Sequence, residues 1–149
     1  MYTAYEGSRM AYYTPTPLDY QTASTRAGLP VCNGLVTSPL SHTSLLLQGE
    51  DDPLTGRPEL TVQLIYVSTP VLIWWPSGMI SVNHGGWRTS TTRARINQFS
   101  PYALAVYRFR GHQWLEWEGL TYGWGSTTIH CVPGDGVRNC HAQHVAHVA

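Results

Sequence analysis

Lysine is absent from this chain of 149 residues, and all nine basic residues are arginine. Arginine without lysine is typical of a GC-rich genome, so we attribute it first to codon bias. Charged residues make up only 12% of the chain, about half of the usual share, which excludes a disordered charged tail and a highly charged coiled coil. No run approaches the roughly 18 apolar residues of a membrane span, and the amino terminus lacks a signal-peptide pattern. We therefore expect a soluble protein made in a cytoplasm, without a membrane partner.

The length predicts one domain, or one domain with an ordered extension. Residues 1–59 are expected to form an irregular amino-terminal arm, because prolines at 15 and 17 exclude a helix there and residues 49–53 have a loop composition. Such a polar arm would be ordered only against its own domain or a partner. Residues 60–120 are predicted to form the core, and residues 121–149 a carboxyl-terminal hairpin and helix, a tail rich in cysteine and histidine. In this tail Cys131 is expected on a strand before a turn at residues 133–136.

The formal net charge of zero hides an uneven distribution along the chain. Residues 1–59 carry six acidic side chains against three arginines, a net charge of −3. Residues 60–115 carry five arginines and no acidic residue, and residues 116–149 carry three acidic residues against one arginine. A basic module thus lies between two acidic segments, which is evidence about partners rather than about fold.

The core begins with three predicted strands. Residues 60–66 alternate apolar and polar side chains, as a half-buried strand does. Residues 71–75 are apolar on both faces, which favours a central strand. Pro76, Ser77 and Gly78 then form a turn, since proline presets its first position and glycine accepts the left-handed one. Residues 79–83 return antiparallel, and the predicted register pairs Leu72 with Val82 and Trp74 with Ile80.

A short helix follows, which Ser90, Thr91 or Thr92 can cap and which Pro101 ends. Helical spacing places Thr92, Ile96 and Phe99 on one face, expected to pack on the sheet. The same spacing places Arg93 with Asn97 on one flank of the helix and Arg95 on the other. Solvent is expected to reach both arginines.

The core ends with a second hairpin, of residues 103–110 and 113–120, around a predicted turn of Gly111 and His112. That turn would set Phe109 opposite Trp114 and Val106 opposite Trp117. The expected fold class is therefore α+β: a small antiparallel sheet of about five strands, in the order β-β-β-α-β-β, with one short helix.

Residues 71–97 carry a specific motif. Two strands joined by a Ser-Gly turn precede Gly-Gly-Trp-Arg-Thr at 85–89, Thr-Thr at 91–92 and Arg-Ile-Asn at 95–97. This pattern resembles a family of small proteins of actinobacterial phages and their hosts, and the hairpin within 107–117 fits the same pattern. The resemblance covers about a third of the chain. It implies a phage or actinobacterial origin, consistent with the missing lysine, and hence a host cytoplasm or a virion, but no activity.

The basic module predicts a nucleic-acid surface. A hydrophobic core explains the glycines and threonines of the motif, but it needs none of the arginines. Arginines and hydroxyl groups at a helix amino terminus suit an anion, of which nucleic-acid phosphate is the commonest. Four sheet aromatics could stack bases beside it, although such aromatics more often pack across strands. They are Trp74, Trp75, Tyr107 and Trp114. The predicted contacts are Arg88, Arg93, Arg95, Asn97, Arg108, Arg110 and Trp75, with Arg108 and Arg110 expected on one strand face.

The tail contains a possible zinc site with the spacing C-x8-C-x3-H-x2-H. Two thiolates and two imidazoles suit tetrahedral zinc, and a helix over 139–148 would place three of these ligands on one face. The spacing is not that of a standard zinc finger, so solvated histidines or a disulfide between the two cysteines are alternatives. The four predicted ligands are Cys131, Cys140, His144 and His147. No other cofactor is expected.

Evidence for catalysis is thin. Glu116 and Glu118 share a strand face, but two such acids are more often solvated than catalytic, and no phosphate loop or nucleophile motif is present. We expect a non-enzyme of one of three kinds. The first is a phage accessory protein that binds nucleic acid. The second is an inhibitor that uses the same surface against an acidic host or defence protein. The third is a virion component whose arm, residues 1–59, contacts neighbouring subunits or further copies of the chain.

Overall fold

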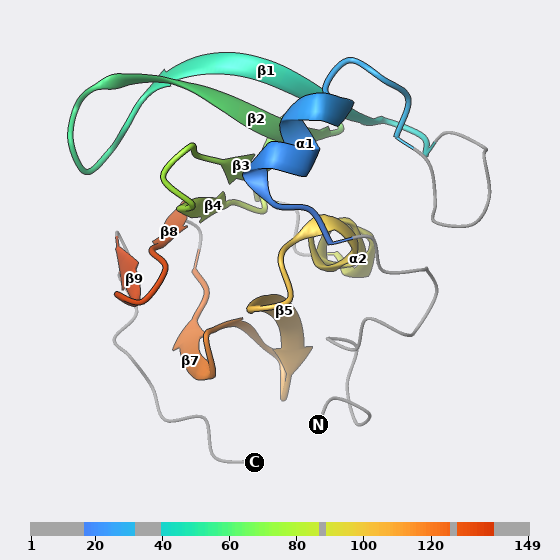
Figure 1. The fold of residues 1–149 in the computed structure, drawn as a ribbon. Helices are drawn as coiled ribbons and strands as arrows, with labels where there is room; N and C mark the ends of the chain where they lie inside the picture. Colours follow the sequence, from blue (N-terminus) through green and yellow to red (C-terminus); the bar gives the residue numbers. More distant parts are fainter. Residues whose placement is uncertain (1–16, 32–39, 87–88, 126–127, 139–149) are drawn as a thin grey trace.

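The computed structural model describes residues 17–31, 40–86, 89–125 and 128–138 (Figure 1). Within these ranges the strands form two antiparallel sheets, one of six strands in the order β1-β2-β3-β4-β8-β9 and one of three in the order β5-β6-β7. No helix among the described residues is long and apolar enough to cross a membrane. The helices are α1 (Tyr20–Arg26) and α2 (Ser90–Phe99), and the strands are β1 (Thr43–Asp51), β2 (Pro58–Tyr66), β3 (Thr69–Trp74), β4 (Ile80–Val82), β5 (Leu104–Phe109), β6 (His112–Trp117), β7 (Leu120–Gly123), β8 (Ile129–Cys131) and β9 (Val137–Arg138).

The arrangement confirms an antiparallel α+β protein, but with nine strands and two helices in the described residues rather than five strands and one helix. Figure 1 shows α2 between the two sheets and α1 against the β1–β2 pair. A single apolar cluster joins both sheets, because Leu64 and Val82 of the first pack in the same core as Val106 and Leu115 of the second.

The β3–β4 hairpin has the predicted register, with Leu72 opposite Val82 and Trp74 opposite Ile80. Its turn is the predicted one. Gly78 takes the left-handed conformation, with φ of 94°, and its N–H donates to the Trp75 carbonyl at 2.9 Å. As expected, β3 lies inside the sheet, between β2 and β4.

The prediction of an irregular arm over residues 1–59 is wrong for the described part of that segment. Helix α1 begins there, with the Asp19 side chain accepting the Thr22 N–H at 2.8 Å. Strand β1 pairs with β2 along its whole length. Sequence patterning missed β1 because it is an edge strand on which only Leu45 is buried, so no apolar alternation is visible. The loop predicted at 49–53 begins later, where the Asp52 carboxylate accepts the Leu54 N–H at 2.7 Å.

Helix α2 begins and ends close to the predicted positions. Its N-cap is Thr89, one residue before the predicted candidates, and the Thr89 Oγ1 accepts the Thr92 N–H at 3.2 Å. The helix ends at Phe99, with Ser100 as its C-cap before the proline. The predicted inward face is confirmed, since Thr92, Ile96 and Phe99 are all buried.

The second hairpin forms, but its register is shifted by two residues from the prediction. Phe109 lies opposite His112, and Val106 opposite Leu115. The turn is Arg110-Gly111, with φ of 53° and 79°, because a two-residue turn with both φ values positive matches the twist of the strands. Strand β7, which was not predicted, adds a third strand to this sheet.

The boundary predicted at residue 120 does not separate structural units, because β8 pairs with β4 inside the first sheet. The predicted carboxyl-terminal hairpin is present as β8 and β9, and Cys131 lies on a strand before the turn as expected. The helix predicted over 139–148 lies outside the described residues.

Candidate nucleic-acid interface

Arg93 and Asn97 are buried, with exposed fractions of 3% and 0%, so the expectation that solvent reaches this flank of α2 is wrong. The Asn97 side chain donates from Nδ2 to the Val106 carbonyl at 2.6 Å and accepts the Val106 N–H at 2.8 Å. It therefore satisfies backbone groups of β5 as a neighbouring strand would. Arg93 donates from Nη1 to the Gln113 Oε1 at 3.1 Å. These two side chains hold the helix against the second sheet.

Trp75 is not available for base stacking in this structure. It is 3% exposed, and its indole N–H donates to the Ser81 Oγ at 2.8 Å. Two further aromatics considered for stacking, Trp74 and Tyr107, are also buried. Among the aromatics considered for stacking, Trp114 alone is only partly buried in the structure. Of these aromatics, only Trp114, on the second hairpin, thus remains partly accessible for base stacking.

Arg95 lies on the other flank of α2 and is half-buried. Its Nε donates to the Thr43 Oγ1 at 3.3 Å, and its guanidinium lies 5.6 Å from the centre of the Tyr66 ring. A hollow of about 270 Å³ opens nearby, lined by Tyr66, Val67 and the threonines 89, 91 and 92. Arg88, which precedes this helix in the sequence, lies outside the described residues.

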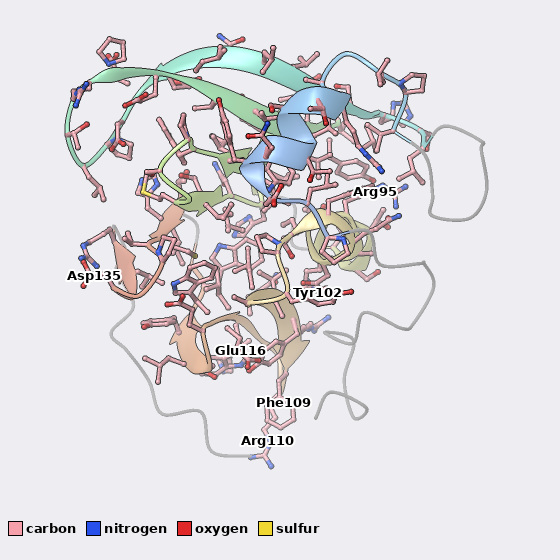
Figure 2. All side chains as sticks on the ribbon, in the orientation of Figure 1. Arg95, Tyr102, Phe109, Arg110, Glu116 and Asp135 are labelled. Atoms are coloured by element: carbon pink, nitrogen blue, oxygen red, sulfur yellow. The ribbon has the colours of Figure 1, made fainter. Side chains whose placement is uncertain are left out.

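Arg108 and Arg110 are exposed on the second hairpin. The expectation that they share a strand face is wrong, because Arg110 lies in the turn after β5. The Arg110 guanidinium is 5.2 Å from the centre of the Phe109 ring, and Figure 2 shows the Phe109 and Arg110 side chains projecting from the tip of the hairpin. Neither arginine forms an ion pair with a carboxylate of the described residues. Within these residues an ion pair joins Arg138 and Asp135.

A groove of about 580 Å³ lies beside Arg108, at the end of the three-stranded sheet. We call it the β6–β7 groove. Among the described residues, its lining combines one cation, two indoles, an imidazole, an amide and three glycines, with no acidic side chain. The lining residues are Arg108, Gly111, His112, Gln113, Trp114, Gly123, Trp124 and Gly125.

The walls of the groove are fixed by hydrogen bonds from three parts of the chain. The backbone N–H of Trp124 donates to the Gln113 carbonyl at 3.0 Å, which continues the β6–β7 pairing past Gly123. Buried His84 lies 2.7 Å from the Gly125 carbonyl through Nε2. Because His84 Nδ1 accepts the Gly86 N–H at 3.0 Å, the Nε2 atom carries the proton. The His84 ring also meets the Trp124 indole edge to face, with centroids 4.8 Å apart.

Sequence reasoning missed His84, Trp124 and Gly125 because the segments that contain them meet only in the folded chain. A signal was present for His84, which directly precedes the Gly85-Gly86 pair of the motif. No local pattern connects that motif with residues 123–125.

The carboxylates considered as a pair are not equivalent. Glu116 lies on β6, whereas Glu118 lies in the turn after it, with φ of 50°. The Glu118 carboxylate accepts the Gly134 N–H at 2.9 and 3.1 Å from its two oxygens. Glu118 therefore anchors the β8–β9 turn, and the expected shared strand face is wrong.

The predicted zinc site is only partly within the described residues. Cys131 is buried on β8, whereas Cys140, His144 and His147 lie outside the described ranges. Among the residues described, no three His, Cys, Asp or Glu side chains group as metal ligands would. Zinc at this site therefore stays a prediction.

The chain was compared with protein-family models, curated proteins and solved structures, and none of these comparisons found a match.

Proposed function

We propose that this chain is a small non-enzymatic phage accessory protein that binds single-stranded nucleic acid. The proposed surface is the second hairpin with Arg108 and Arg110, together with the β6–β7 groove beside it. The observation that carries the proposal is this groove, whose described lining residues include an exposed arginine and two tryptophans but no carboxylate. Cations neutralise phosphates, and aromatic side chains stack on bases, whatever the sequence of the strand.

The charge pattern supports the same surface. Residues 60–115 contain five arginines and no acidic residue. Of these arginines, Arg93 is used inside the fold, whereas Arg108 and Arg110 extend into solvent without a carboxylate partner in the described residues. Figure 2 shows Arg95 on α2, well away from Arg110 at the hairpin tip, so the two arginines mark separate surfaces.

The experiment is a titration of a labelled single-stranded oligonucleotide followed by fluorescence anisotropy. The double variant Arg108→Ala/Arg110→Ala is expected to bind at least tenfold more weakly for every sequence tried. Arg57→Ala, an exposed arginine on the β1–β2 turn, removes the same kind of charge elsewhere and should bind as the unmodified protein does. Absence of binding at low salt, or equal affinity of the double variant, would contradict the proposal.

A protein-binding function is the second candidate, and the β1–β2 hairpin favours it. Leu47, Leu54 and Leu60 are each about half exposed there, near the acidic side chains Glu50 and Asp51. Such a surface suits a protein neighbour, as in an inhibitor of a host factor, a virion component or an oligomer of this chain. Pull-down from expressing cells with and without nuclease separates the candidates, because a nucleic-acid partner is lost on digestion and a protein partner is retained.

A further inference from the structure

We propose that the β6–β7 groove holds one unstacked base of a single strand, while Arg108 contacts an adjacent phosphate. This inference rests on the proposed function and makes it more specific. It predicts preference for single strands over duplexes, because a paired base inside a duplex cannot enter a groove of this kind.

The shape of the groove fits a planar ligand. Trp114 pairs in register with Gly123, and Gly125 follows two residues later. Of the three residues that line this side of the groove, Gly123 and Gly125 therefore contribute backbone alone, and Trp124 contributes an indole. The indole of Trp114 lines the groove, and its N–H donates to the Phe109 carbonyl at 3.3 Å, which fixes the orientation of the ring. The volume of about 580 Å³ is within the range of small-molecule sites.

The polar groups of the groove are mainly donors. Arg108 lies directly opposite Gln113 in the β5–β6 register. The Gln113 Oε1 already accepts from buried Arg93, which leaves the amide N–H groups of Gln113 as its donors. The buried Trp124 indole N–H finds no acceptor among the described residues. Phosphates carry only acceptors, and the edges of bases carry several, so these donors complement a nucleotide.

The groove is formed before any ligand binds. The hydrogen bonds made by buried Arg93 and buried His84 hold Gln113 and Gly125 on its two sides. A preformed site loses less conformational entropy on binding than a mobile loop does. Stacking in the groove therefore adds affinity to the contacts made by the arginines.

Gly125→Val tests the groove without changing any charge. A Cβ at Gly125 would meet no atom within 4 Å, and the backbone of this residue is outside the left-handed region. Valine should thus fill part of the groove while the protein stays folded. Gly49→Val is the matched control, because Gly49 on β1 is equally open and lies on the other sheet.

The probe is an eight-residue oligothymidine, titrated against the full chain at two salt concentrations. Gly125→Val is expected to weaken binding about tenfold while the dependence on salt is unchanged, and Gly49→Val to bind as the unmodified protein does. The oligonucleotide should quench tryptophan fluorescence less in Trp114→Phe than in the unmodified protein, and a duplex should bind at least tenfold more weakly.

The outcomes distinguish this inference from the proposed function. If the arginine double variant loses affinity but folded Gly125→Val does not, the chain binds nucleic acid and the groove inference is overturned. Equal affinity for duplex and single strand overturns it as well. If the unmodified protein does not bind at low salt, both proposals fail. Trp114→Leu gives a second test that does not depend on how Gly125→Val folds, since it should weaken binding whereas Trp114→Phe should largely retain it.

Discussion

Asn97→Ala should be among the most destabilising single substitutions in this chain. The Asn97 amide is fully buried and satisfies both backbone polar groups of Val106, at 2.8 and 2.6 Å. Alanine leaves a buried N–H and a buried carbonyl without these partners, at about 1–3 kcal/mol each. We therefore expect the free energy of unfolding to fall by roughly 2–6 kcal/mol.

The loss is measurable by thermal or denaturant unfolding. For a chain of this size, about 1 kcal/mol corresponds to a change of about 2–4 °C in Tm, so Tm should fall by roughly 4 °C or more. Thr91→Ala is the matched control, because Thr91 is exposed on the same helix and its replacement should change stability by less than about 0.5 kcal/mol. A loss below about 1 kcal/mol for Asn97→Ala would show that its two hydrogen bonds to Val106 are not a major source of stability.

Asn97→Asp separates the two hydrogen bonds of this side chain. An aspartate oxygen still accepts the Val106 N–H, but the other oxygen would face the Val106 carbonyl and repel it. Protonation restores a donor, so this variant should lose less stability, relative to the unmodified protein, at pH 4 than at pH 7. Oligonucleotide affinity of the folded fraction should be unchanged in both variants, whereas a direct contact at Asn97 would lower the affinity without loss of stability.

Three further predictions concern the glycine pair, a buried histidine and the tail. Gly85→Ala should destabilise by roughly 1–3 kcal/mol, because its Cβ would lie 2.5 Å from the Thr69 Cγ2; Gly86→Ala, with no atom within 4 Å, should lose clearly less, and equal Tm values would refute the clash. Burial lowers the pKa of His130 below its ordinary 6.5, an effect partly opposed by Asp52, so the unfolded chain binds a proton more readily and stability should fall as pH decreases below about 6.5. His130→Gln should flatten that acid-side slope, and an unchanged slope would assign it to other groups. If the Cys131 site binds zinc, protein never exposed to chelator should contain about one equivalent, and metal analysis that finds none would end the hypothesis.

The parts of the fold predicted correctly are those with local determinants. The β3–β4 hairpin follows from its Pro-Ser-Gly turn and two apolar strands, and the end of α2 follows from Pro101. The register of the second hairpin was predicted two residues away from the observed one, because Gly111 accepts a positive φ at either position of the turn. Nothing local indicates that Arg110, rather than His112, is the other turn residue. Strand β1 was missed because its pairing with β2 supplies what its own side-chain pattern does not.

The site was predicted in part, and the errors have a common physical cause. A helical wheel places Arg93 and Asn97 on a flank of α2, but it cannot show that β5 and β6 return to bury that flank. Arg108 and Arg110 were recognised because runs of one charge are visible in sequence. The groove was not recognised, because the pairing of β6 with β7 brings Gln113 and Trp124 together, and packing between the two sheets places His84 against Trp124.

The salt dependence of single-strand affinity shows whether Arg108 and Arg110 contact phosphate. In a plot of log affinity against log salt concentration, each phosphate contact on a single strand contributes a slope of about −0.7. Arg108→Ala/Arg110→Ala should therefore flatten the slope by about 1.4 relative to the unmodified protein, while Arg57→Ala leaves it unchanged. Equal slopes for the double variant and the unmodified protein would show that these arginines do not contact phosphate and would contradict the proposed function.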